Sequence, residues 1–255
     1  MELSLVKTII LFALIGLSGF IDSIAGGGGL VSLPAYFIVG FPPHMATGTN
    51  KLSAFMGACV ATFNYARAGF IPLKIAAFSI IAAFAGASAG AKISLMVSDL
   101  WFKVILLFVL PAVAVYVFKD KHLDEKREPY SYVKTVLLCM PISFFVGMYD
   151  GFYGPGTGMF LILLYTSVAH LPLEIANGVS KAVNLTSNVA SLIVFLMNGT
   201  TIIKYGLIAG CASMICSYIG SSLFKRDGSR IVRPVMLLVL FIFSAKIILE
   251  LLGLA

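Results

Sequence analysis

Charged side chains are scarce in this sequence. Asp, Glu, Lys and Arg make up 11% of its 255 residues, less than half of the ~25% that is usual in soluble domains. Hydrophobic residues make up 60%, and they gather in runs that are too long for the core of a soluble protein. This composition excludes a disordered chain and nearly every soluble enzyme, and it predicts an integral membrane protein.

The sequence also lacks the motifs that mark many enzymes, metal sites and nucleotide-binding proteins. None of its 4 cysteines forms a C-x-x-C pair, and its 3 histidines are scattered. It contains no HExxH or P-loop sequence. We therefore expect no metal, no cofactor and no ATP hydrolysis by this chain, and a membrane-embedded enzyme is poorly supported.

Basic residues exceed acidic ones, with 18 Lys and Arg against 11 Asp and Glu, for a net charge of +7. Most of this excess lies between apolar runs, where it indicates membrane topology. We therefore expect a lipid bilayer and no nucleic acid around this protein. The first apolar run has no clear small-residue cleavage site after it, so it is expected to be a retained helix.

Apolar runs recur along the whole chain, and eight of them approach or exceed the ~17 residues that span a bilayer. Two runs, 30–41 and 158–169, are short, and each follows a glycine-rich break. The sequence therefore predicts an all-α polytopic membrane protein with about eight long transmembrane helices and two short ones. The runs cover residues 4–20, 30–41, 46–66, 71–97, 100–118, 132–149, 158–169, 175–197, 201–223 and 231–252.

An internal repeat relates the two halves of the chain. GFIDSIAGGGG from residue 19 matches GMYDGFYGPGTG from residue 147. Asp22 then corresponds to Asp150, and Lys51 to Lys181. A match sustained over this length is not expected by chance, so each half is predicted to be one copy of the same unit.

Charge predicts how the two copies are oriented. We expect a first transmembrane repeat over 1–118, a charged cytoplasmic linker over 119–131 and a second repeat over 132–255. If each glycine break returns the chain toward the side it came from, more basic residues lie on the cytoplasmic side than if each break is only a kink. The re-entrant arrangement makes the halves inverted repeats, which is a common plan in secondary transporters.

The glycine breaks are the first candidate site. Non-helical backbone at membrane depth is tolerated only where protein or a water-filled cavity surrounds it. The short helices that begin near Leu30 and Gly158 direct N–H groups and positive dipole character back into the breaks, which suits an anion. Alternatively, the glycines only permit close helix packing. The candidate substrate-binding residues here are Gly27, Gly28, Gly29, Gly156, Thr157 and Gly158, with Thr157 also expected to cap its helix.

Two lysines near the starts of long apolar helices are the second candidate site. A lysine inside a membrane helix is costly unless it is paired or faces water. The alternatives are a lysine that snorkels to the interface and polar neighbours that only join helices by hydrogen bonds. With their neighbours, the candidate residues are Thr49, Asn50, Lys51, Ser180, Lys181 and Asn184. Thr47 or Thr49 is expected to cap the first of these helices and Asn177 the second.

Asp22 and Asp150 are the acidic residues beside the breaks. They are candidates to pair with the two lysines or to take up protons that couple transport. The structural alternative is that each carboxylate only caps N–H groups of its break.

The breaks and the segments after them resemble the sulfite exporter TauE/SafE family, also called the 4-toluene sulfonate uptake permease family. The resemblance is carried by GGGGLVSLP and ATGTNK in the first half and by YGPGTG and VSK in the second. It implies a polytopic inner (plasma) membrane protein that moves small sulfur-containing anions such as sulfite, sulfoacetate or other sulfonates. The positions it covers are Gly26 to Gly29, Thr49, Asn50, Lys51, Gly154, Pro155, Gly156, Thr157, Gly158, Ser180 and Lys181.

The leading hypothesis is a secondary transporter that moves such an anion by alternating access, with export as the expected direction. Residue chemistry alone argues only for anion binding, and sulfur specificity comes from the resemblance. The alternatives are an anion channel, a transporter for a non-sulfur organic anion and an accessory subunit without transport activity of its own.

Overall fold

The computed structural model describes residues 3–98, 128–228, 230–232 and 234–235. Within these ranges every regular element is a helix. The predicted run at 100–118, nearly all of the run at 231–252 and most of the linker at 119–131 lie outside the described residues.

The described helices follow the predicted runs closely in both halves. The first half contains α1 (Leu5–Ala25), α2 (Gly29–Ile38), α3 (Pro43–Arg67) and α4 (Leu73–Met96). The second half contains α6 (Tyr132–Phe152), α7 (Thr157–Ser167), α8 (Leu173–Met197) and α9 (Ile203–Asp227). The short helices α2 and α7 therefore begin within one residue of the positions expected from the glycine breaks.

The predicted helix caps are wrong. Thr157 is the first residue of α7, and Gly156, with φ of 82°, stands at the N-cap. Thr47, Thr49 and Asn177 lie inside α3 and α8, because these helices begin directly after Pro42 and Pro172. A proline fixes φ and needs no N–H partner, so it starts each helix earlier than the first polar side chain suggested.

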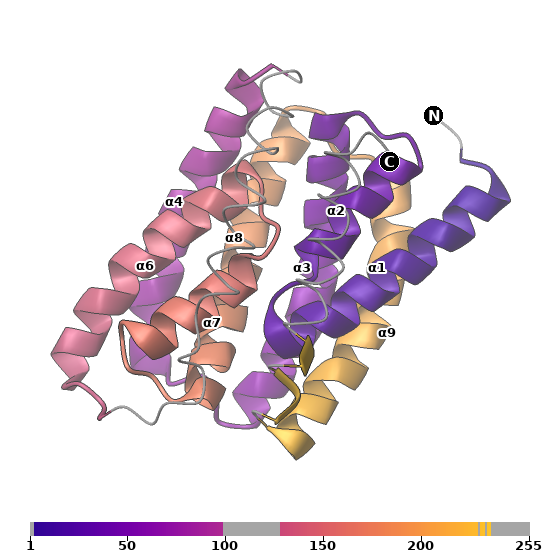
Figure 1. Ribbon diagram of the computed structural model, residues 1–255. Helices are drawn as coiled ribbons and strands as arrows, with labels where there is room; N and C mark the ends of the chain where they lie inside the picture. Colours follow the sequence, from indigo (N-terminus) through magenta and orange to yellow (C-terminus); the bar gives the residue numbers. More distant parts are fainter. Residues whose placement is uncertain (1–2, 99–127, 229, 233, 236–255) are drawn as a thin grey trace, which may run out of the picture.

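The two halves are intertwined. In Figure 1, α1 lies beside α9 at one edge of the molecule and α4 lies beside α6 at the other, with α3 and α8 between them. The α4–α6 contact is close, since a Cβ atom on Gly86 would lie 2.1 Å from the Phe144 carbonyl oxygen, and one on Gly90 1.9 Å from that of Met148. These glycines form the small-residue face that lets two helix backbones approach.

Equivalent residues of the two halves make equivalent contacts. A Cβ atom on Gly19 of α1 would lie 2.7 Å from the Ser213 carbonyl oxygen of α9. One on the corresponding Gly147 of α6 would lie 2.9 Å from the Ala83 carbonyl oxygen of α4. The sequence repeat is therefore also a repeat of contacts, in which the first helix of each half packs against the last described helix of the other.

Within the described residues, 5 helices are long and apolar enough to cross a membrane, namely α1, α4, α6, α8 and α9. Large apolar side chains such as Leu5, Ile81 and Phe145 are exposed on them, as expected where lipid is the solvent. Helix α3 has the necessary length of 25 residues but is more polar. Six of its polar residues are buried and therefore face protein, namely Thr47, Thr49, Asn50, Lys51, Ser53 and Asn64. The prediction of a multi-pass membrane protein is confirmed.

Candidate functional site

The two glycine breaks lie against each other at the centre of the molecule. A Cβ atom on Gly26 would lie 2.3 Å from the Gly158 carbonyl carbon, and one on Gly29 would lie 2.8 Å from Pro155 Cα. The Met159 backbone N–H donates to the Gly26 carbonyl oxygen at 3.3 Å. Each break therefore surrounds the other with protein, which is how irregular backbone is tolerated at membrane depth.

Each lysine pairs with the aspartate of the other half. Lys51 Nζ of α3 lies 2.9 Å from Asp150 Oδ2 at the end of α6, and Lys181 Nζ of α8 lies 3.2 Å from Asp22 Oδ2 near the end of α1. Each ammonium also donates to the backbone carbonyl oxygen of its aspartate. The lysine side chains are only 2% and 0% exposed, so the snorkelling alternative is wrong.

The two ion pairs have different surroundings. Asp150 is 3% exposed, and its carboxylate also accepts hydrogen bonds from Thr157 Oγ1 at 2.8 Å and Ser187 Oγ at 2.6 Å. Asp22 is 24% exposed, and besides its lysine the only described donor to its carboxylate is the Gly28 backbone N–H, at a longer distance of 3.3 Å. The second-half carboxylate is therefore enclosed by donors, whereas the first-half carboxylate is partly open.

The repeat explains this difference. In the alignment of the two halves, Gly29 corresponds to Thr157 and Gly57 corresponds to Ser187. The first half thus has glycines at both positions whose hydroxyl groups enclose Asp150. Asp22 therefore lacks those two hydroxyl donors, and an open space lies beside it.

That space is a polar cavity of about 40 Å³, and both Gly29 and Gly57 line it together with Asp22. A site needs only about 10–15 Å³ by this measure to hold one water, so several water molecules or a small ion fit. The other polar residues that line it come from five helices and are Ser18, Ser32, Asn50, Asn184, Asn188, Ser213 and Ser217.

One polar atom beside the cavity has no partner in the described part of the chain. Asn50 Oδ1 is buried and accepts no hydrogen bond from the residues that the structure describes, although buried polar atoms are nearly always satisfied. Asn184 and Asn188 of α8 are joined by a hydrogen bond of 3.1 Å between Asn188 Nδ2 and Asn184 Oδ1. The cavity thus combines amide groups that can turn toward a ligand with an ion pair that is partly open.

The structure brings together some predicted residues and gives others structural roles. The cavity is lined by Asp22, Gly29, Asn50 and Asn184. Lys181 does not line it but is the ion-pair partner of Asp22. Thr49 Oγ1 instead accepts from the Ile202 backbone N–H at 2.9 Å, and Ser180 Oγ donates to the Asn177 carbonyl oxygen at 2.9 Å. Lys51 and Asp150 form the enclosed pair, and Thr157 donates to the Asp150 carboxylate. The breaks are shaped by Gly27, Gly28, Gly156 and Gly158.

Sequence reasoning missed the contribution of α9. Ser213 and Ser217 line the cavity, and Ser221 follows one turn later on the same face. This one-turn spacing of serines in an otherwise apolar helix was the available signal. In the described residues no group of three or more His, Cys, Asp or Glu side chains could hold a metal ion.

Apolar helices that can cross a membrane, broken helices that meet at the centre and a polar cavity with a buried ion pair define a membrane transporter. The family described as "Sulfite exporter TauE/SafE" matches residues 11–247, and the chain belongs to this family.

Relatives from several bacteria are similar over nearly their whole length. A "probable membrane transporter protein" of Haemophilus influenzae is 35% identical over 250 residues, which cover 97% of each chain. One from a Sinorhizobium species is 34% identical, covering 93% of this chain and 91% of the relative. The protein YfcA of Escherichia coli, also named a "probable membrane transporter protein", is 32% identical, covering 94% and 88%. No solved structure matches this chain.

Proposed function

We propose that this protein is a secondary transporter that moves a small sulfur-containing anion, such as sulfite, sulfoacetate or another sulfonate, out across the inner membrane by alternating access. The observation that carries the proposal is the buried Lys181–Asp22 pair at the edge of a polar cavity. A buried cation whose counterion is partly open can exchange that counterion for an anionic substrate.

The anion binds by taking the place of the Asp22 carboxylate beside Lys181. Its oxygens accept hydrogen bonds from the amides of Asn50, Asn184 and Asn188, which line the same cavity. Asp22, once released from Lys181, is free to take up a proton, which couples anion movement to the proton gradient. The sulfur chemistry of the substrate is supported by the family to which the chain belongs.

The crosswise pairing supports alternating access. Each ion pair joins a helix of one half to the break of the other half. If the halves are inverted repeats, a movement of one half relative to the other changes both pairs together. The enclosed Lys51–Asp150 pair then stabilises the present conformation while Lys181 exchanges the Asp22 carboxylate for the anion.

The competing function is an anion channel. A carrier shows saturable flux that is stimulated by substrate on the opposite side, whereas a channel conducts without such exchange. The two buried lysines favour a carrier, because an open pore needs no buried cation with a carboxylate partner.

The test is sulfite efflux from proteoliposomes that contain the purified protein. We expect saturable efflux, accelerated by sulfite outside, and its loss in the Lys51→Ala and Lys181→Ala double variant. Lys181→Met, which keeps the side-chain volume, is the second variant in case the double variant does not fold. A folded variant of either kind that transports sulfite at the normal rate contradicts the proposal.

A further inference from the structure

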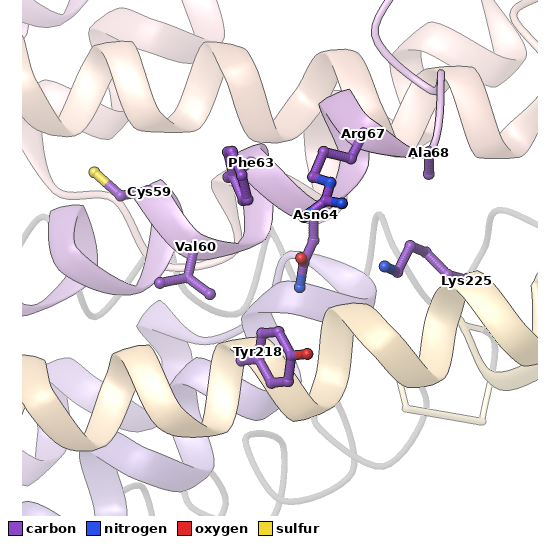
Figure 2. A pocket seen from close by; sticks show the side chains of 8 residues that line it. All are labelled: Cys59, Val60, Phe63, Asn64, Arg67, Ala68, Tyr218 and Lys225. Atoms are coloured by element: carbon purple, nitrogen blue, oxygen red, sulfur yellow. The ribbon is translucent and has the colours of Figure 1, made fainter.

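A second, larger pocket lies between α3 and α9, close to the last turns of both helices. Its volume is about 700 Å³, within the range of about 300–1,000 Å³ that is usual for ligand pockets. Figure 2 shows Arg67 from α3 and Lys225 from α9 extending into the same space, with Asn64 and Tyr218 beside them.

The two cations of this pocket have no acidic partner among the residues that the structure describes. Arg67 lies over the Phe63 ring at 5.6 Å, and neither Arg67 nor Lys225 forms an ion pair in that part of the chain. Two cations that share one concave space without a neutralising carboxylate raise the local concentration of anions.

The pocket continues the central cavity along the same pair of helices. On α3, Gly57 lines the cavity, and Asn64, two turns later on the same face, lines the pocket. On α9, Ser217 lines the cavity, and Lys225, two turns later on the same face, lines the pocket. A line of small and polar residues therefore leads from the Lys181–Asp22 pair to the Arg67 and Lys225 side chains.

One hydrogen bond crosses this line. Asn64 Nδ2 donates to Ser221 Oγ at 2.8 Å, and both side chains are buried. The bond lies between the cavity and the end of the helices at which Arg67 and Lys225 stand, so it supplies polar groups where an anion passes between the two spaces.

The other half of the chain provides an internal comparison. In the alignment of the repeats, Asn64 corresponds to Val194, Ser221 to Ala91 and Lys225 to Leu95, and these three apolar residues belong to one hydrophobic cluster. Arg67 corresponds to Met197. Helix packing at the equivalent contact is therefore satisfied by apolar residues, and the polar line between α3 and α9 serves another purpose.

We infer that the pocket of Arg67 and Lys225 is a second anion-binding site, the mouth through which a small oxyanion reaches the central cavity past Asn64 and Ser221. The inference rests on the proposed function for the sulfite-like identity of the anion. The bound group carries two or three anionic or polar oxygens, a chemistry that a free oxyanion shares with the phosphate of a lipid headgroup.

The first test compares sulfite flux of the wild type with that of an Arg67→Gln and Lys225→Gln double variant. We expect the sulfite concentration at half-maximal flux to rise about tenfold, since two exposed charge interactions are lost, while the maximal rate is kept. A Lys74→Gln and Lys134→Gln variant, which removes two exposed cations outside the pocket, is the matched control and should behave like the wild type. The inference is overturned if the sulfite concentration at half-maximal flux is unchanged, or if it changes equally in the control variant.

Vesicle composition separates the two sources of the oxyanion. The expected shift occurs in vesicles of phosphatidylcholine alone, which assigns the site to the free anion. A shift that occurs only when phosphatidylglycerol is present shows that a lipid headgroup occupies the pocket and overturns its role as a mouth. Absence of sulfite flux in the wild type contradicts the proposed function itself, so the two failures are distinguishable.

The second test replaces the polar pair by the residues of the other half, Asn64→Val and Ser221→Ala. Because this variant leaves Arg67 and Lys225 in place, we expect a lower maximal flux and an unchanged sulfite concentration at half-maximal flux. Normal flux in this variant shows that the anion does not pass between α3 and α9, and it overturns the inference.

Discussion

At the scale of single residues, charge burial dominates the site. An ammonium group taken out of water costs several kcal/mol unless it is paired and hydrogen-bonded. Lys51 and Lys181 each meet a carboxylate and a backbone carbonyl oxygen of the opposite half. The charges are therefore retained at the centre of the protein, where they are available to an anion.

The two carboxylates are expected to respond differently to neutralisation. Asp150→Asn leaves Lys51 buried without a counterion and should lower the free energy of unfolding by about 3–5 kcal/mol. Asp22→Asn should cost less, because the 24% exposed Asp22 borders a cavity where water or an anion can take its place. Chemical denaturation of both variants in detergent measures the difference.

The control for this comparison is Asp150→Asn combined with Lys51→Met, which removes the whole enclosed pair and should recover part of the lost stability. Equal stability losses in the two single variants would contradict the different surroundings assigned to the two aspartates.

The sequence identified these charged residues but not their pairing. Asp22, Asp150, Lys51 and Lys181 stood out because charge is rare in the apolar runs. Which lysine meets which aspartate depends on how one half docks against the break of the other, and a repeat contains no such information. The difference between the two pairs could have been read from Gly29 opposite Thr157 only once the contacts of Thr157 were known.

At the scale of elements, the broken helices define the centre of the molecule. Gly26 ends α1 with φ of 77° and touches Gly158 at the second residue of α7. Two requirements therefore meet at Gly26, a left-handed backbone and the absence of a side chain.

A matched pair of substitutions separates these requirements. Gly69 has φ of 78°, but a Cβ atom there would meet nothing within 4 Å. Gly69→Ala should therefore cost only about 1 kcal/mol of backbone strain, whereas Gly26→Ala should also separate the two breaks and abolish the folded state. Size-exclusion profiles and melting temperatures of the two variants decide, and similar behaviour would contradict the contact between the breaks.

Glycine and proline made the elements predictable. The breaks placed the starts of α2 and α7 within one residue, because these residues act through the backbone alone. The polar face of α9 was not predicted, since the role of serines in an apolar helix can be inferred only when it is known that α3 packs against them.

At the scale of the whole molecule, the halves depend on each other. Helix α1 packs against α9, and α4 packs against α6, so the large contacts of each half are with the other. The boundaries 1–118 and 132–255 therefore describe repeats in sequence, and they are not expected to be independent folding units.

Separate expression tests this dependence. Fragments 1–124 and 125–255 should each be unstable alone, because each exposes glycine-rich faces that need the other half. Expressed together, they should form a complex that is purified through a tag on either fragment. A fragment that is monodisperse and thermally stable by itself would contradict the intertwined fold.

The sequence predicted the membrane character, the repeat and most helix boundaries, because long apolar runs and punctuation by glycine and proline determine them. The inverted orientation of the halves stays a prediction, since it rests on the distribution of basic residues across a bilayer. The intertwining was not predicted, because it depends on contacts between segments far apart in the chain.

The central claim is that an anion binds beside Lys181 in the polar cavity that Asp22 lines. Its most direct test is thermal stabilisation of the purified protein by sulfite, sulfate, thiosulfate, sulfoacetate, taurine, carboxylates and phosphate at constant ionic strength, since a ligand of the folded state raises the apparent melting temperature. We predict stabilisation by sulfite or a sulfonate in the wild type and in Arg67→Gln, and its loss in Lys181→Met. No stabilisation by any of these anions, or equal stabilisation of wild type and Lys181→Met, would contradict the account.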